Sequence, residues 1–305
     1  MNLSSSILFT LVYADIFQYA YTFDELVAWM PKNTWKKTAI QKQLHSLIKK
    51  KIVSEKSPFI TLYGHTKNIQ IRLNRQEYAI IKWKKAQRAA GILRLIPTIM
   101  FIGVTGGLSI QNADEGDDID LYICAKKGTL WITRFFSTVL LEMFGIRRRP
   151  ETRDVKDTIC LNMFVTEDAL AVPRQERDLY TAHEVLQMEL LWERGGAYTA
   201  FLKKNAWVSE VFFQKWKEAI QKHKSKHVNF QQRSFIVCIE SFLKIVEKPA
   251  KYIQLWYMKE RRTSEVVSDT ILRFHPHDAR LWIHTRLQSK LKRYYLPLDK
   301  NFFRT

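Results

Sequence analysis

Two β-type segments joined by a glycine pair lie near the middle of the chain. The first, residues 98–104, is β-branched and aromatic, which predicts a buried strand. Gly106 and Gly107 follow, and ten residues then lead to the second segment, Asp-Ile-Asp-Leu-Tyr-Ile, which begins at Asp118. Because side chains two apart in a strand point to the same side, Asp118 and Asp120 are expected side by side on one face.

This order of residues indicates a metal and a phosphate group. Two adjacent carboxylates repel each other and stay ionised most readily around a divalent cation, and Mg²⁺ prefers oxygen ligands. A glycine pair lets the backbone approach a phosphate closely and leaves N–H groups to point at it. A lone Asp-x-Asp arises often by chance, whereas strand, Gly-Gly, spacer and Asp-x-Asp strand together are more specific. The sequence therefore predicts a site for Mg²⁺ and a nucleoside triphosphate.

The stretch Gly103–Ile123, GVTGGLSIQNADEGDDIDLYI, resembles the signature of the DNA polymerase beta-like nucleotidyltransferase superfamily. The resemblance implies a mixed sheet with helices on one face. It also implies Mg²⁺-dependent transfer of a nucleoside monophosphate from a nucleoside triphosphate such as ATP to a hydroxyl, with pyrophosphate leaving. The acceptor and the base are not specified.

The resemblance assigns roles to individual residues. Asp118 and Asp120 are the catalytic pair that holds Mg²⁺, and Gly106 and Gly107 lie against the β- and γ-phosphates. Gly107 stands where the superfamily usually has serine, and Ser109 is the nearby residue that could supply a hydroxyl to the nucleotide.

The chain departs from the superfamily at the third carboxylate, which usually lies on the next strand of the site. That strand is expected over 158–165, and its strongly polar middle residue is Asn162. An amide oxygen can ligate Mg²⁺ but cannot act as a base, so Asn162 is expected as a neutral metal ligand. Asp157, Glu167 and Asp168 are substitutes at poorer positions, with turn capping as their other interpretation. A catalytically degenerate nucleotide-binding or nucleic-acid-binding regulatory protein is therefore the alternative to an enzyme.

Residues 1–75 are expected to form a winged helix. Thr22 and Glu25 fit a capping box, and helices are expected over 7–19, 22–30 and 34–50, the first capped by the serines at 4–6. Short β-type runs follow at 52–53, 59–63 and 69–73. The third helix could contact DNA or RNA, but it carries no arginine, and winged helices also serve as packing modules.

The remaining chain completes an α+β multidomain arrangement. Residues 76–175 are expected to hold the nucleotidyltransferase-type mixed sheet with its helices, including one from 77 to 95. Residues 176–305 are expected to form an α-helical domain, with helices over 176–193, 249–261 and 264–274 among others.

Charge is distributed unevenly along the chain. The net charge is +11 for residues 1–99, −5 for 100–199 and +13 for 200–305. An acidic site between basic flanks suggests RNA or DNA as a partner, although lysine-rich helices can also be merely solvated. The basic turn residues Arg147, Arg148, Arg149 and Arg153 could contact a triphosphate or an anionic acceptor, with solvated turn residues as the alternative.

The cysteines and the apolar segments of the sequence indicate the cellular compartment of the protein. The three cysteines are too few and too far apart for a disulfide framework, which favours a reducing compartment. The apolar run at 7–14 has no cationic stretch before it, and the longest uncharged segment contains proline and glycines, so neither a signal peptide nor a membrane helix is expected. We expect a soluble, cytoplasmic protein.

Overall fold

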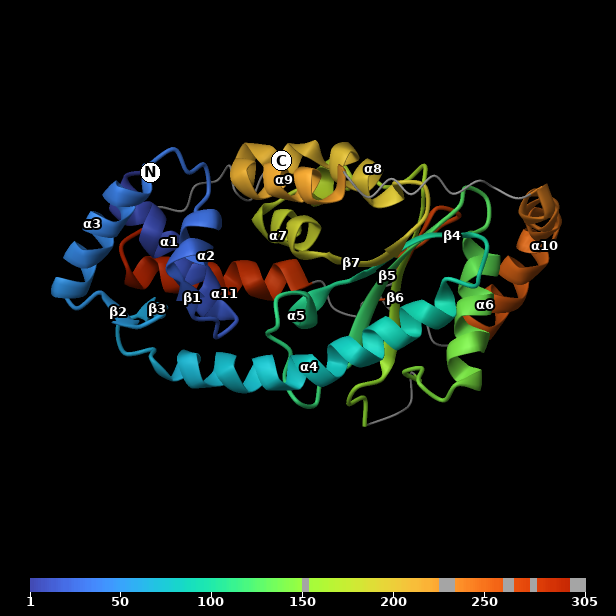
Figure 1. The fold of residues 1–305 in the computed structure, drawn as a ribbon, viewed down its shortest axis with the longest axis horizontal. Helices are drawn as coiled ribbons and strands as arrows, with labels where there is room; N and C mark the ends of the chain where they lie inside the picture. The colour runs from blue at the N-terminus through green and yellow to red at the C-terminus, as the bar shows by residue number, and fades with distance from the viewer. Residues whose placement is uncertain (150–153, 225–233, 260–265, 275–278, 297–305) are drawn as a thin grey trace.

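The computed structural model describes residues 1–305 except 150–153, 225–233, 260–265, 275–278 and 297–305 (Figure 1). It is a mixed α and β structure around a mixed sheet of six strands in the order β7-β4-β5-β6-β9-β8. The strands are β4 (Ile99–Val104), β5 (Ile119–Ala125), β6 (Ile159–Thr166), β7 (Glu189–Glu193), β8 (Val266–Val267) and β9 (Ile271–Arg273). Only β5 and β6 pair in parallel, and the other neighbours are antiparallel.

Helices cover both faces of this sheet. Ile119, Leu121 and Ile123 of β5 face one hydrophobic core, which is shared with α4 (Lys67–Leu93), α6 (Leu130–Met143) and α10 (Ser234–Met258). Tyr122 faces the opposite core, where it packs near Phe201 of α8 (Ala197–Lys204). Figure 1 shows α4 along one long side of the molecule and α9 (Ser209–Lys224) along the other.

The N-terminal segment contains three helices and a small antiparallel sheet. The helices are α1 (Leu3–Ile16), α2 (Phe23–Ala28) and α3 (Lys37–Lys49), and the strands β1 (Tyr21–Thr22), β2 (Val53–Lys56) and β3 (Phe59–Leu62) pair in the order β1-β3-β2. The predicted capping box is confirmed: Thr22 and Glu25 cap each other at the start of α2. The first helix starts earlier than expected because Asn2, not a serine, accepts the hydrogen bond from the Ser5 amide.

The expected β-run at 69–73 is wrong, because these residues belong to α4. This helix begins at Lys67 and continues to Leu93. Its buried positions recur mostly three or four residues apart and include Arg72, Arg75, Ala79, Lys82 and Ala86. The polar side chains at some of these positions obscure the helical period in the sequence.

The C-terminal part departs furthest from expectation, because residues 176–305 are not wholly helical. The helix expected over 176–193 ends as α7 (Leu179–Gln187), and Glu189–Glu193 instead forms β7 at one edge of the sheet. The helix expected over 264–274 is replaced by β8 and β9, and β9 pairs with β6. In both places a neighbouring strand, β4 or β6, offers backbone groups for pairing. For segments this short, pairing with that strand decides between strand and helix.

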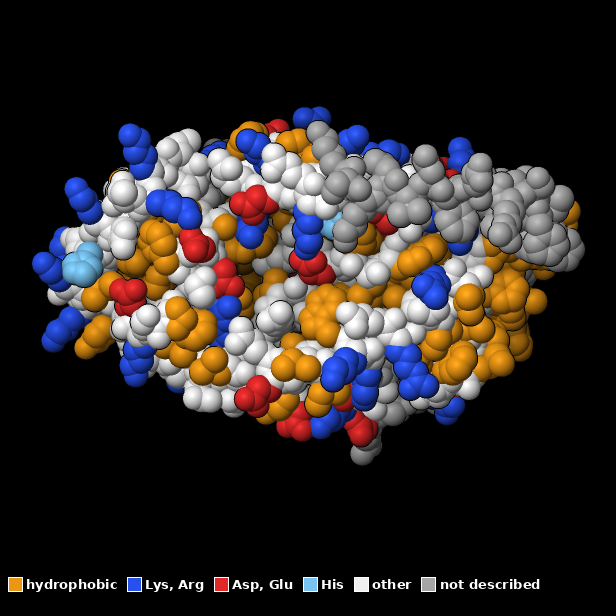
Figure 2. All heavy atoms as spheres, viewed as in Figure 1, with side chains coloured by type: hydrophobic (Ala, Val, Ile, Leu, Met, Phe, Trp, Pro, Cys, Tyr) orange, Lys and Arg blue, Asp and Glu red, His pale blue; other side chains and the backbone are white. Residues whose placement is uncertain are grey.

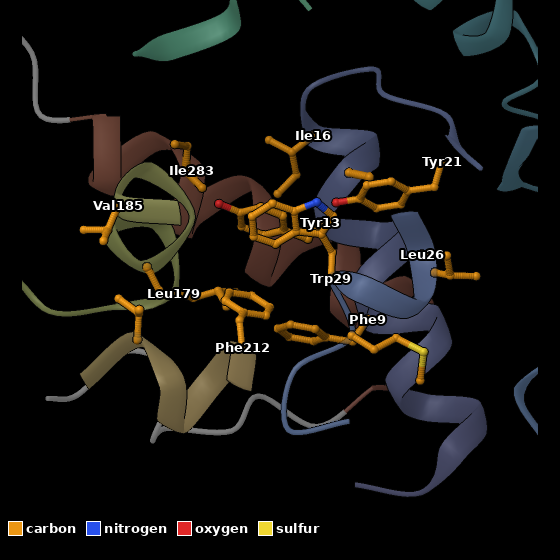
Figure 3. Packing of buried hydrophobic residues seen from close by; sticks show 14 of the residues in the cluster. Phe9, Tyr13, Ile16, Tyr21, Leu26, Trp29, Leu179, Val185, Phe212 and Ile283 are labelled. Atoms are coloured by element: carbon orange, nitrogen blue, oxygen red, sulfur yellow. The ribbon is translucent and has the colours of Figure 1, made fainter. Parts of the chain in front are cut away.

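One core joins the two ends of the chain. Figure 3 shows side chains from α1, α7, α9 and α11 (Ala279–Arg293) pointing toward one another around Tyr13 and Trp29. Within the described residues, no helix is both long and apolar enough to cross a membrane.

Candidate functional site

Strand β5 brings the two predicted carboxylates together. Asp118 precedes the strand and Asp120 lies within it, and both are half-buried. Oxygen atoms of Asp118 and Asp120 and the sulfur of Cys160 all lie within 4.8 Å of one another. The expectation that the two aspartates share one face is confirmed by this convergence.

The glycine turn lies against this pair. Gly106 has a φ of +65°, and a Cβ atom built on it would lie 2.9 Å from Oδ2 of Asp120. Glycine is therefore required at position 106 both by the backbone conformation and by the close approach of the carboxylate.

The second glycine and Ser109 face other neighbours. A Cβ atom on Gly107 would lie 3.1 Å from the carbonyl oxygen of Asn112 and 3.3 Å from backbone atoms of Ala113. A serine at position 107 would therefore require the backbone at Asn112 and Ala113 to shift by a few tenths of an ångström. Ser109, at the end of the short helix α5 (Gly106–Ser109), donates its hydroxyl to the carbonyl of Gly106 at 2.8 Å, so its hydroxyl proton is engaged within the turn.

Strand β6 contributes Cys160 and Asn162. Asp120 pairs in register with Cys160 and Tyr122 pairs with Met163, so β6 has one residue more than β5 between these pairs. This irregularity brings the Asn162 side chain to Asp120, to which its amide nitrogen donates a hydrogen bond. The Cys160 thiol donates to the amide oxygen of Asn162 at 2.7 Å. Asn162 thus lies where it was predicted, but it presents its nitrogen to the carboxylate.

An arginine neutralises the other carboxylate. Nη1 of Arg148 lies 2.6 Å from Oδ2 of Asp118, and it contacts the Cys160 sulfur at 3.7 Å. Arg147 and Arg149 instead pair with Glu142 of α6. Arg148 is therefore the member of the basic turn that reaches the site; Arg153 falls outside the described residues.

A carboxylate of α7, that of Glu184, adds to the electrostatics of Asp120. Burial raises the pKa of Asp120, and the charges of Asp118 and Glu184 raise it further, opposed by Arg148. Burial also raises the pKa of Glu184 to about 7. Sequence analysis missed Glu184, because it lies in a segment expected to belong to a separate helical domain and no motif marks it.

The substitutes considered for the third carboxylate lie elsewhere. Burial raises the pKa of Asp157, but hydrogen bonds from Lys82 and Lys85 lower it by more. The pKa of Asp157 is therefore below its usual value. Glu167 and Asp168 follow the far end of β6, where Thr166 pairs with Ala125 rather than with Asp120. The strand register therefore separates both from the Asp118–Asp120 pair.

The donor set can be compared with what Mg²⁺ requires. Two carboxylates that converge beside an open backbone turn suit a hard cation. A thiol does not, because sulfur ligands favour softer metals. Asn162 would offer its oxygen only if its amide group turned over. The residues present therefore fit one Mg²⁺ held by Asp118 and Asp120, with Asn162 as an additional neutral donor after that reorientation.

No protein-family model matches the chain, and comparisons with curated proteins and with solved structures give no match.

Proposed function

We propose that the protein is a Mg²⁺-dependent nucleotidyltransferase of the DNA polymerase beta-like type. The observation that carries this proposal is the convergence of Asp118 and Asp120 beside Gly106, with a carboxylate oxygen close to where a Cβ atom would be. The order strand, glycine turn and acidic strand supports it, because β4, α5 and β5 follow one another in the chain and β4 pairs with β5.

The residues have separate roles in this proposal. Asp118 and Asp120 would hold Mg²⁺, which supplies positive charge against the triphosphate. Gly106 and Gly107 let the backbone approach the triphosphate closely, and their N–H groups would donate to phosphate oxygens. The acceptor hydroxyl oxygen forms a bond to the α-phosphorus, the bond from that phosphorus to the bridging oxygen breaks, and pyrophosphate leaves. Asn162 cannot take the hydroxyl proton, which passes to water.

The proposal also covers the order of the domains along the chain and the cellular compartment of the protein. The three N-terminal helices with their small sheet support a winged-helix-like segment, followed by the nucleotidyltransferase-type sheet and a mainly helical C-terminal part. The two cysteines whose side chains the structure describes, Cys124 and Cys160, are free. Free cysteines are usual in the cytoplasm, where we place the activity.

The alternative is a degenerate member that binds a nucleotide without transferring it. The neutral Asn162 on β6 favours this alternative, because a two-metal mechanism clamps both the attacking and the leaving oxygen. A single Mg²⁺ leaves more of the catalysis to positioning of the reactants.

The test compares Asp118→Asn and Asp120→Asn with Asp168→Asn, which changes the same residue type beyond the far end of β6. We expect Mg²⁺ and a nonhydrolysable triphosphate to stabilise the wild type and Asp168→Asn, by about 2.7 kcal/mol at a hundred times the dissociation constant. Both site variants should lose this stabilisation and the transfer of a labelled nucleotide. Stabilisation of Asp120→Asn equal to that of the wild type would overturn the site, whereas binding without transfer would favour the degenerate alternative.

A further inference from the structure

A cleft of about 780 Å³ lies beside the glycine turn and is not part of the carboxylate site. Its walls come from the end of α1, the start of α4, the 112–117 loop and α11, and Gly107 is among the residues that line it. Figure 2 shows that the molecule is hollowed at the centre of this face, with acidic and basic side chains around the hollow. Neither Asp118 nor Asp120 lines the cleft, but Gly107, which follows Gly106 in the glycine turn, does.

Two of the three acidic side chains that line the cleft form ion pairs, and the third, Asp117, accepts a hydrogen bond from the Asp114 amide. Asp15 is buried and accepts hydrogen bonds from His65, Asn68 and Lys290. The guanidinium group of Arg75 forms a two-pronged contact with Asp114, at 2.7 and 2.8 Å. Within each ion pair the two charges offset each other, and the contacts hold these side chains in place along the walls of the cleft.

Three cations at the cleft have no such partner. Among the residues that the structure describes, Lys67, Arg286 and Arg293 take part in no ion pair, although each lines the cleft. Arg286 and Arg293 are exposed and lie on the same helix, α11. The cleft therefore presents positive charge that is not neutralised from within, which suits a ligand with several phosphate groups.

The cleft also has an aromatic wall. Trp282 is 41% exposed and lines the cleft together with Phe17, whose ring centroid is 6.0 Å away. The guanidinium carbon of Arg286 lies 5.0 Å from the centroid of the Trp282 ring. An exposed indole beside unpaired arginines is the combination that binds single-stranded nucleic acids, because every base can stack and every phosphate is anionic.

We propose that this cleft binds the end of a single-stranded nucleic acid and presents it as the acceptor. The inference rests on the proposed function, since it assigns the acceptor to a cleft whose lining includes a residue of the glycine turn. The strand stacks a base near Trp282 and directs its phosphates to Arg286, Arg293 and Lys67.

The first test measures binding of a short fluorescent single-stranded RNA to the full chain in EDTA, so that the metal site takes no part. Arg286→Glu/Arg293→Glu is compared with Lys84→Glu/Arg88→Glu, which makes the same change in net charge on exposed residues of α4 outside the cleft. We expect the cleft variant to lose about a hundred-fold in affinity and the control less than about three-fold. The slope of log affinity against log salt should become shallower by about 0.7 for each phosphate that the variant no longer neutralises. Equal losses in the two variants would show diffuse binding and overturn the proposal.

The second test leaves the charge unchanged. Trp282→Ala is compared with Trp256→Ala, which removes a tryptophan that is 79% exposed on α10. Loss of one stacked base lowers affinity by about ten-fold, so Trp282→Ala should bind RNA about ten-fold more weakly and Trp256→Ala should bind as the wild type does. Unchanged RNA affinity in Trp282→Ala would overturn the stacking role.

A third measurement separates this inference from the proposed function. Binding of a nonhydrolysable triphosphate with Mg²⁺ should survive Arg286→Glu/Arg293→Glu and fail in Asp118→Asn, whereas RNA binding in EDTA should show the reverse. If the cleft variant loses triphosphate and RNA equally, the cleft holds the donor nucleotide, and the acceptor proposal is wrong. If Asp118→Asn keeps triphosphate binding while the RNA results hold, the proposed function fails and the cleft remains a nucleic-acid site.

Discussion

Asn162 shows how a single side chain can limit the chemistry of the site. It is buried, its amide nitrogen donates to Asp120, and its amide oxygen accepts from the Cys160 thiol. This arrangement stabilises the ionised form of Asp120 without adding a negative charge. The site therefore holds its two carboxylates together in the absence of a cation, but it offers a second cation little attraction.

The change Asn162→Asp should convert this neutral support into a third metal ligand. Without metal, the new carboxylate would face Asp120 and destabilise the fold. With Mg²⁺, the added charge should tighten binding by roughly ten-fold, which corresponds to about 1.4 kcal/mol. Thermal unfolding with EDTA and with increasing Mg²⁺ measures both effects, and the transfer rate should rise in parallel.

The control for this prediction is Asn162→Leu, which removes the hydrogen bonds without adding charge. A Mg²⁺-induced shift in Asn162→Asp no larger than in the wild type would show that position 162 does not face the metal. A larger shift in Mg²⁺ stabilisation without faster transfer would instead limit the role of the third carboxylate to binding.

At the scale of single residues, the sequence predicts well the positions of those site residues that belong to a short motif. Asp118, Asp120 and Gly106 come together because strand alternation and a tight turn are local properties. Cys160 and Glu184 could not be predicted. The first reaches the site through the register of two strands, and the second through the packing of α7, and neither relation is visible in a linear pattern.

Among the elements, α4 does more than cover the sheet. Lys82, which is 1% exposed, donates to the carbonyl groups of Glu115 and Asp117 and to the carboxylate of Asp157 at 2.8 Å. It thereby joins a helix, the loop before Asp118 and the segment before β6. The two strands that carry the site are held in position by one buried ammonium group.

Lys82→Met should therefore destabilise the protein and loosen the site together. Removing one partner of a buried ion pair costs about 3 kcal/mol, because the remaining groups stay buried without compensation. Lys85→Met is the control, since Lys85 contacts the same carboxylate at 3.0 Å but is 49% exposed, and an exposed pair contributes at most about 1 kcal/mol. Urea unfolding of both variants measures the difference, and equal costs would contradict the tethering role.

The elements themselves were predicted unevenly. The capping box at Thr22, the strands 98–104 and 118–123 and the helix over 77–95 follow from local signals, and the structure contains all of them, the last as part of α4. The segments 189–193 and 271–273 become strands because β4 and β6 supply partners. The local pattern of a short apolar segment does not indicate which distant strand it pairs with. It therefore cannot decide between helix and strand.

Across the whole molecule, the N-terminal and C-terminal segments share one hydrophobic core. The sequence suggests three successive units divided near residues 75 and 175, and that division stays a prediction. The core nevertheless continues from α1 and α2 into α7, α9 and α11. The same contact between α1 and α11 forms the walls of the cleft, so the proposed acceptor site depends on both ends of the chain.

His183 lies at the centre of this shared core. Its ring stacks between Tyr13, at 4.3 Å, and Trp29, at 4.8 Å, with Phe212 edge-on at 4.6 Å. Burial lowers the pKa of His183 to about 4, although its hydrogen bond with the Leu179 carbonyl works in the opposite direction. The folded protein therefore keeps this ring neutral under conditions in which the unfolded chain protonates it.

The stability of the whole protein should consequently depend on His183 between pH 6.5 and pH 4. An unfolded histidine has a pKa of about 6.5, so in this window the unfolded state binds the proton more strongly and stability falls as the pH falls. By linkage the loss reaches about 2 kcal/mol at pH 5 relative to pH 8. His183→Phe keeps an aromatic ring between Tyr13 and Trp29 and removes the titration, so its urea midpoint should change less over this range than that of the wild type. His45→Phe, on the exposed side of α3, is the control; if it flattens the pH profile as much as His183→Phe, the acid sensitivity does not arise from the core that joins the two ends of the chain.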